Sequence, residues 1–299
     1  AVDSSDNLYT VGNASGPTPH LVKSDSSGTI LWQRKVTSAV SYSAVGTDSS
    51  GNVYAGTTEG TLIKYNSSGT IQWQRKLAST AYNAIAIDSS GNVYATGYSV
   101  VGSRSDIQLV KYNSSGTIQW QTALSTGYAS TNTRGYDLKL DSSGNPHIAA
   151  IAVVGGYNYM YVIKLNTSGV VQWQRYMTTL SGGAYGIAID SSSNVYVTGF
   201  SKPFGDSVGL IFKYDSSGTI QWKRQVYTIV SSVVYGTMFS IAVGSNNEFY
   251  ATGYTRVDAS NYNGITLKLP TDGSLTGART VGGFRSEEHT SELQSHHDL

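Results

Sequence analysis

Few residues of this 299-residue chain have the types and spacings that catalysis requires. The sequence has no cysteine, which excludes disulfides, thiolate catalysis and cysteine-ligated zinc. It contains no G-x-S-x-G, H-E-x-x-H, P-loop or dinucleotide-binding motif. Before residue 284 the acidic residues do not cluster in the close pairs that glycoside hydrolysis needs. We therefore expect no catalytic residue, no metal site and no cofactor.

The side chains best suited to binding are aromatic and charged residues in connecting segments of unequal length. Tyrosine offers an apolar ring together with a hydroxyl, and Arg and Asp add charge-assisted hydrogen bonds. We predict that these residues contact a ligand; the alternative for each is a solvated loop position without a binding role. The candidates are Tyr98, Arg104, Asp106, Tyr157, Tyr159, Phe204, Asp206, Arg256, Asp258 and Tyr262.

A second candidate site is a charged pair beside a tyrosine. Asp137 and Lys139 are two residues apart in a β-type run, so their side chains share one face, and Tyr136 precedes them. The position of Lys139 corresponds to small residues elsewhere in the chain, such as Ala86 and Ala188. If buried, the two charges must pair with each other. Two interpretations stay open, a ligand-binding or catalytic spot and a loosely packed interior.

These candidates are carried by an internal repeat that dominates the sequence. One repeated element reads IAIDSSGNVYATGY at 85–98, and the other reads LVKYNSSGTIQWQ at 109–121. The two elements alternate and form six units. Five units are marked by a tryptophan, and Gly277 occupies the corresponding position of the sixth. The tryptophans are Trp32, Trp73, Trp120, Trp173 and Trp222.

Each unit holds four short runs rich in Val, Ile, Tyr, Thr and Trp, which we name strands a to d. In the third unit they lie near 83–87, 92–97, 107–112 and 117–124. Asp-Ser-Ser-Gly-Asn joins a to b, Asn-Ser-Ser-Gly-Thr joins c to d, and both are typical turn sequences. Four strands per repeat of this length predict a propeller blade. We predict an all-β protein, a β-propeller of six four-stranded blades over residues 1–283, with an incomplete seven-bladed propeller as the alternative.

The repeat resembles a known family. The segments DSSGNVYATGYS and LVKYNSSGTIQWQRKL are similar to the seven-bladed β-propeller repeats of bacterial surface proteins and phage structural proteins. The resemblance covers roughly residues 1–283 and implies a propeller fold, but its motif consists of turn and packing residues and implies no activity. The chain departs from the family in having six units rather than seven.

Differences in length fall on one side of the predicted blades. The a–b and c–d turns barely change in length, whereas the b–c connection does. The b–c connection reads TTEG at 57–60, YSVVGSRSD at 98–106, FSKPFGDSVG at 200–209 and YTRVDASNYNG at 254–264. Strand alternation puts the constant turns on one rim and the variable connections on the other, which we call the b–c rim. Connections without a packing role are where recognition is usually found. We therefore predict that the b–c rim is the binding face.

Three residue types recur along the units and have packing interpretations. A tyrosine at the start of strand a either surrounds a channel mouth or fills the inner core. A strand-c lysine is expected to pair with the turn aspartate, and a strand-d arginine is expected to stack on the tryptophan of a neighbouring blade. The tyrosines are Tyr42, Tyr82, Tyr136 and Tyr185; the lysines are Lys23, Lys64, Lys111, Lys164, Lys213 and Lys268; the arginines are Arg34, Arg75, Arg175, Arg224 and Arg279.

The tail at 284–299 differs in kind from the repeats. It has no strand alternation and no glycine turn, and it resembles translated adapter sequence. We expect it to be disordered or foreign to the protein. Its histidines, His289, His296 and His297, are metal ligands by type, but an unanchored tail does not hold them in place.

Composition limits the partners. Lys and Arg number 20 and Asp and Glu 19, so the formal net charge of +1 favours neither nucleic acid nor an anionic membrane. No apolar run approaches the ~20 residues of a membrane span, and residue 1 falls inside a predicted strand, consistent with a truncated N-terminus. We hypothesise a non-catalytic binding or scaffold module, extracellular, on a cell surface or on a virion, that recognises glycan or a surface protein. The alternatives are an enzyme, a lyase or hydrolase, with its site at the channel mouth, and a purely structural spacer in a surface or phage fibre protein.

Overall fold

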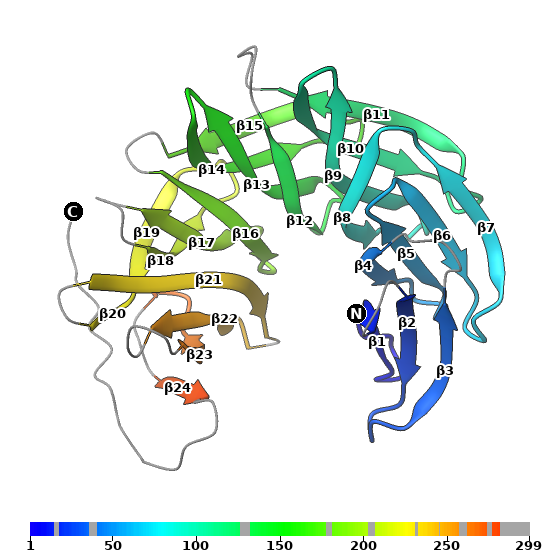
Figure 1. The fold of residues 1–299 in the computed structure, drawn as a ribbon, viewed down its shortest axis with the longest axis horizontal. Coiled ribbons are helices and arrows are strands. Elements are labelled where there is room, and N and C mark those ends of the chain that lie inside the picture. The colour runs from blue at the N-terminus through cyan, green and yellow to red at the C-terminus, as the bar shows by residue number, and fades with distance from the viewer. Residues whose placement is uncertain are drawn as a thin grey trace. The chain divides into compact units, whose positions relative to one another are not determined.

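The computed structural model describes most of the repeat region. The described residues are 1–14, 18–35, 41–125, 132–177, 181–202, 207–230, 233–244, 246–256, 262–273 and 277–281. Within them every regular element is a β-strand, and the strands pair in antiparallel sheets, one sheet for each repeat (Figure 1). The chain divides into two compact units, residues 1–140 with 166–170, and residues 141–165 with 171–299.

The first unit contains the first three sheets and strand β12. Its first sheet has three strands, and Val2 forms an isolated bridge with Leu8 where a fourth strand is expected. The next two sheets have the four strands that the repeat predicts. The strands are β1 (Leu8–Ala14), β2 (Thr18–Ser24), β3 (Ile30–Lys35), β4 (Tyr42–Thr47), β5 (Val53–Thr57), β6 (Thr61–Tyr65), β7 (Ile71–Lys76), β8 (Thr80–Ile87), β9 (Val93–Val101), β10 (Arg104–Tyr112), β11 (Ile118–Leu124) and β12 (Arg134–Leu140).

The second unit contains the remaining strands of the fourth sheet, whose order is β12-β13-β14-β15, and the last two sheets. The fifth sheet has four strands and the sixth has five, because the short strand β20 adds to its edge. The strands are β13 (Pro146–Val154), β14 (Tyr157–Leu165), β15 (Val171–Tyr176), β16 (Ser181–Ile189), β17 (Val195–Lys202), β18 (Val208–Tyr214), β19 (Ile220–Val226), β20 (Thr228–Val230), β21 (Val233–Val243), β22 (Phe249–Arg256), β23 (Tyr262–Leu269) and β24 (Gly277–Val281).

The constant turns form because an Asp or Asn side chain closes each of them. The Oδ1 atom of Asp88 accepts hydrogen bonds from the backbone N–H groups of Ser90 and Asn92, at 3.0 and 2.9 Å. Gly91 follows with φ +76°, a left-handed conformation that glycine adopts without steric cost. The same Asx turn with the same φ sign recurs at the other blades, so local sequence determines where each hairpin turns.

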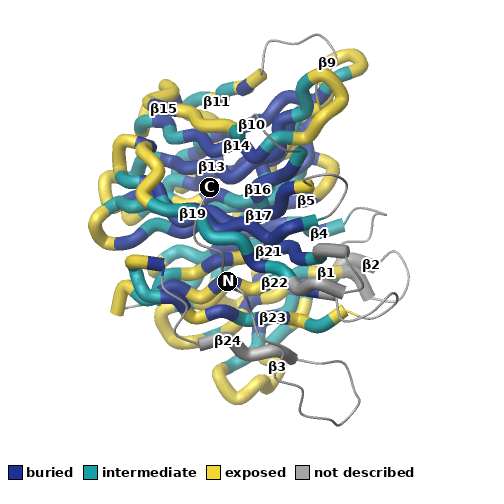
Figure 2. The backbone as a smooth tube through the Cα atoms, turned by 90° about the vertical axis from the view of Figure 1, so that its left-hand side faces the viewer, coloured by how far each residue is buried: buried dark blue, intermediate teal, exposed yellow. Residues whose placement is uncertain are grey.

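The core lies between neighbouring sheets. In the first unit one cluster joins Tyr54 and Leu62 of the second sheet to Val93 and Val110 of the third, and all four are fully buried. The small residues predicted on strand a allow this approach: a Cβ on Gly46 would lie 2.7 Å from the Ile87 side chain. Figure 2 shows the middle strands, such as β13, β14 and β17, largely as buried and the hairpin ends as exposed.

Two details of the predicted strands are corrected by the structure. The connection predicted at 98–106 is mostly strand, because β9 and β10 extend to Val101 and Arg104 and form a long hairpin. The b–c connections at 200–209 and 254–264 are likewise shortened by extensions of β17, β18, β22 and β23. The variable feature of the b–c rim is therefore hairpin length.

The recurrent strand-a tyrosines belong to two structural classes. Tyr42 and Tyr82 lie six residues before the turn aspartate, are buried, and share hydrogen bonds with the strand-c hydroxyls of Tyr65 and Tyr112, both at 2.7 Å. The tyrosines five residues before the aspartate, Tyr136 and Tyr185, are only half-buried.

The one-residue difference matters because β4, β8, β16 and β21 each contain a β-bulge at this point. Tyr185 falls at the bulge between Ala184 and Gly186, so its side chain does not follow the alternation of Tyr42 and Tyr82. The core interpretation is confirmed for Tyr42 and Tyr82 and does not hold for Tyr185.

Candidate functional site

The backbone carbonyls of the c–d turns accept hydrogen bonds from the preceding blade and so join neighbouring blades. The strand-d Trp73 donates its Nε1–H to the carbonyl of Ser114 in the next blade at 3.1 Å, and Arg75 donates to the carbonyls of Ser115 and Gly116. Equivalent bonds involve the other four tryptophans, and Thr122 replaces the arginine at one junction. The c–d turns of this rim therefore take part in the contacts between blades.

The arginine contact corrects one expectation. On four strands the strand-d arginine stacks on the tryptophan of its own strand, as Arg75 does on Trp73 with 5.5 Å between Cζ and the ring centroid. It reaches the neighbouring blade by hydrogen bonds to turn carbonyls. The reason is strand alternation, which places residues two apart on the same face.

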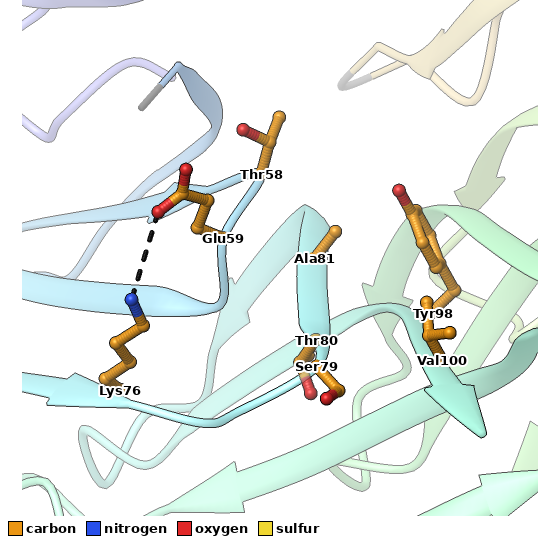
Figure 3. Close-up of a pocket in the computed structure, with 8 residues that line it drawn as sticks. All are labelled: Thr58, Glu59, Lys76, Ser79, Thr80, Ala81, Tyr98 and Val100. Carbon is orange, nitrogen blue, oxygen red and sulfur yellow. Dashed lines mark ion pairs between the residues drawn. The ribbon is translucent and has the colours of Figure 1, made fainter. Parts of the chain in front are cut away.

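A groove opens on the b–c rim of the first unit, with a cavity volume of about 340 Å³. Figure 3 shows Glu59 and Lys76 on one side and Tyr98 and Val100 on the other, with residues 79–81 between them. The groove exists because the second blade has the short turn at 57–60, whereas β9 of the third blade extends past it.

The groove lining combines opposite charges, hydroxyls and one aromatic ring. The Lys76 Nζ lies 3.9 Å from the Glu59 Oε2, and both side chains are more than half exposed. The guanidinium of Arg134 lies 4.4 Å from the Tyr98 ring centroid and holds the ring in place. Ser79 has φ +55°, an uncommon conformation for a residue with a side chain. Such a groove suits a small polar ligand or an extended segment of a partner.

The predicted residues beside Tyr98 are not part of this groove. Tyr98 pairs with Ile107 and Ser99 pairs with Asp106, so Tyr98 and Asp106 point to opposite faces of the hairpin. Asp106 is 3% exposed, and its Oδ2 lies 3.4 Å from the Nε of Arg104. Its other carboxylate oxygen has no hydrogen-bond partner among the described residues.

The charged pair of the fourth blade is present as a pair. The Nζ of Lys139 donates to the Oδ1 of Asp137 at 2.8 Å, and the two side chains are 46% and 22% exposed. The pair is therefore solvated, and no buried charge needs compensation there. Tyr136 is half-buried on the same strand. None of the three lines the described groove.

The remaining candidates lie on separate hairpins or outside the described residues. Tyr157 is 62% exposed at the start of β14, and Tyr159 on the same strand is half-buried. Tyr262 begins β23 and is 53% exposed. Phe204, Asp206, Asp258, the side chain of Arg256 and the tail at 284–299 fall outside the described residues.

The structure reveals a row of aromatic rings in the second unit, which we call the aromatic row. Ring centroids are separated by 5.5 Å between Phe200 and Tyr185, 5.4 Å between Tyr185 and Phe239, 5.5 Å between Phe239 and Tyr254, and 5.1 Å between Tyr254 and Tyr262. Only Tyr185 and Tyr262 were singled out from the sequence. Comparison of strand-a positions could have found Phe239, which occupies the same place as Tyr185 five residues before the turn.

The strand-c lysines partly follow their predicted pairing. The Nζ of Lys164 lies 3.1 Å from Asp141, and that of Lys23 lies 3.7 Å from Asp3. Lys64 and Lys213 instead donate to turn carbonyls of the next blade. Among the described residues, no cluster of three or more His, Asp or Glu side chains could hold a metal ion. In the same part of the chain, no helix is long and apolar enough to cross a membrane.

Antiparallel sheets of about four strands, packed face to face and joined by outer-strand contacts to the next turn, define a β-propeller; the described residues form six such sheets. A family profile described as outer membrane protein assembly factor BamB matches residues 18–252. That match covers more than half of the chain, so the chain belongs to this family. No protein with a curated description matches the sequence.

Solved structures with the same fold are distant in sequence. BamB from Moraxella catarrhalis is 15% identical, with a TM-score of 0.50 over 94% of this chain and 87% of that one. Sqt1 from Saccharomyces cerevisiae is 11% identical, with a TM-score of 0.60 over 96% and 76%. A protein of unknown function from Bacteroides caccae is 12% identical, with a TM-score of 0.57 over 92% and 94%. At these identities the likeness establishes the fold alone.

Proposed function

We propose that the protein is a non-catalytic binding or scaffold module of the cell envelope that holds its partner on the b–c rim. The observation that carries this proposal is a structural difference between the two rims. The c–d turns of the constant rim bind the neighbouring blade through their carbonyls, whereas the b–c rim has the groove and the hairpins of unequal length.

Exposed apolar side chains at the hairpin ends support the proposal. Val100 and Val101 are 49% and 52% exposed beside the groove, and Tyr157 is 62% exposed on another hairpin. Apolar groups at the edge of a polar surface are typical of interaction sites. The membership in the BamB family favours the cell envelope as the location and a protein as one kind of partner.

The non-catalytic part of the proposal has its own support. Lys139 and Asp137, the pair on which an enzymatic site would depend, are paired to each other in solvent rather than placed in the groove. A turnover activity that disappears in Lys139→Ala while the fold stays intact would overturn this part and favour a lyase or hydrolase.

A matched pair of variants tests the binding face. Val101→Asp places a charge on the b–c rim, and Ile71→Asp places the same charge at an equally exposed residue (52% for both) on the outer strand β7. We expect immobilised wild type and Ile71→Asp to retain the same component of a solubilised envelope fraction, and Val101→Asp to lose at least tenfold of it. Equal retention by all three proteins, or loss with Ile71→Asp alone, would contradict the proposed face.

A further inference from the structure

The aromatic row occupies positions that have another role in the first unit. At the strand-a bulge, Ser43 donates to the carbonyl of Tyr82 in the next blade, and the amide of Asn83 donates to the carbonyl of Gly135 at 2.8 Å. The same positions in the fifth and sixth blades hold Tyr185 and Phe239, whose rings contact each other. Two polar links are thus replaced by aromatic rings.

Packing in the core does not explain why aromatic rings replace these polar links, because the row extends from a buried ring to exposed ones. Phe200 at one end is 8% exposed, whereas Phe239 and Tyr262 are 44% and 53% exposed. Exposing a phenylalanine ring forfeits most of the stabilisation that its burial would give. An uncovered ring at this position is expected where the ring contacts a ligand.

The contacts between neighbouring rings fix the arrangement of the row before a ligand binds. Each ring touches the next, with interplanar angles from 19° between Tyr185 and Phe200 to 84° between Tyr254 and Tyr262. Rings held in this way lose little conformational entropy when a ligand arrives.

The chemistry of the row selects the ligand class. The five members of the row are two phenylalanines and three tyrosines, all of them uncharged side chains. The row itself therefore offers a ligand ring faces and hydroxyl groups rather than charges. A sugar ring has an apolar C–H face that stacks on an aromatic ring and polar edges that bond to tyrosine hydroxyls. We propose that the aromatic row binds a neutral oligosaccharide by stacking.

This inference rests on the proposed function, because the row lies where β17, β22 and β23 reach the b–c rim. It adds a ligand class, and its site differs from the groove. The row is in the second unit, whereas Val101 and the groove are in the first. The two proposals can therefore fail separately.

The test measures the affinity of the purified chain for cello-, chito- and maltohexaose by titration calorimetry. We expect at least one to bind with an affinity insensitive to salt, and we expect Phe239→Ala and Tyr262→Ala each to weaken that affinity about tenfold. Tyr250→Ala is the control, since Tyr250 is a 40% exposed tyrosine of the same blade outside the row; it should leave the affinity unchanged.

A second variant separates stacking from simple apolar contact. Phe239→Leu keeps an apolar side chain but removes the ring, so we expect a loss close to that of Phe239→Ala. Binding by Phe239→Leu at the wild-type affinity would overturn the stacking site and favour an apolar protein partner. Failure of the folded wild type to bind any of the three sugars would overturn it as well, even if the Val101→Asp result supports the b–c rim.

Discussion

At the scale of single residues, the fourth blade shows how one substitution changes the chemistry of a turn. In the first, second and fifth blades a strand-b tyrosine donates its hydroxyl to the turn aspartate, as Tyr54 does to Asp48 at 2.9 Å. His147 replaces that tyrosine, is fully buried, and has its Nδ1 3.1 Å from the carbonyl of Asn145. Burial, assisted by the positive charge of Lys164, lowers the pKa of His147 to about 4.

The direction of this pKa shift predicts a loss of stability in mild acid. The unfolded histidine binds a proton near its ordinary pKa of 6.5 and the folded one only near 4, so protonation favours the unfolded state between these values. We expect the free energy of unfolding to fall by about 2 kcal/mol from pH 8 to pH 5. His147→Tyr should remove most of this fall, as measured by urea titration at both pH values.

The turn carboxylates bind protons at a lower pH than His147 does, and this difference serves as the control. Burial by itself would raise the pKa of Asp141, but hydrogen bonds from Asn145 and Lys164 hold it below its ordinary value of 3.8. Its contribution is lost only as the pH falls below 3.8, outside the window of His147. An unchanged slope between pH 8 and pH 5 in His147→Tyr would contradict the role assigned to the histidine.

At the scale of elements, the c–d turn of one blade packs against the strand-d tryptophan of the preceding blade. Gly116 has φ +80°, and a Cβ added there would lie 2.9 Å from the Trp73 ring of the second blade. The turn glycine thus meets two demands, a left-handed backbone and a close approach of an indole. Gly28 in the first blade meets only one, since it has φ +88° and no atom lies within 4 Å of its added Cβ.

This difference allows the two demands to be measured separately. Gly28→Ala should cost about 1 kcal/mol through backbone strain alone. Gly116→Ala should cost about 1–3 kcal/mol more, because the tryptophan must move and its hydrogen bond to Ser114 is strained. Thermal or urea unfolding of the two variants tests this, and equal losses would show that the indole contact does not constrain the turn.

At the scale of the whole molecule, stability in a repeat array is a sum of blades and of the interfaces between successive blades. Trp173 lies in a core cluster that contains residues of both the fourth and the fifth sheet, including Val162 and Phe212. Its Nε1–H also donates to Ser216 of the fifth blade at 3.1 Å. A single outer-strand side chain therefore couples two neighbouring blades.

The coupling predicts a local pattern of hydrogen exchange. Trp173→Ala should raise amide exchange rates at least tenfold in strands β13–β15 and β16–β19, because both blades lose packing and one hydrogen bond. Strands β5–β7 belong to the second blade, which is not a sequence neighbour of the fourth or the fifth blade, and should exchange as in wild type. Uniformly faster exchange across all six blades would contradict nearest-neighbour stability and indicate one cooperative unit.

The local sequence determined most of the architecture. Each Asp/Asn-Ser-Ser-Gly turn closes through its own side chain and glycine, and alternating apolar runs define the strands between turns, so the six units and the identity of the two rims could be predicted. The pairing of Asp137 with Lys139 could be anticipated as well, because residues two apart on a strand share a face.

The tertiary structure decided the features that depend on neighbours in space. The turn–arginine bonds and the groove beside Tyr98 arise from how one blade meets the next. The half-buried position of Tyr185 depends on a bulge in the pairing of β16 with β17, and the burial of Asp106 is a property of the folded structure. The aromatic row is the strongest example, since its five rings come from segments spread over residues 185–262. Local turn chemistry acts within a few residues and can be predicted from the sequence. Hydrogen bonds from the strand-c lysines and the strand-d side chains to the c–d turns of the next blade join residues 34 to 58 positions apart and exist only after the sheets have packed.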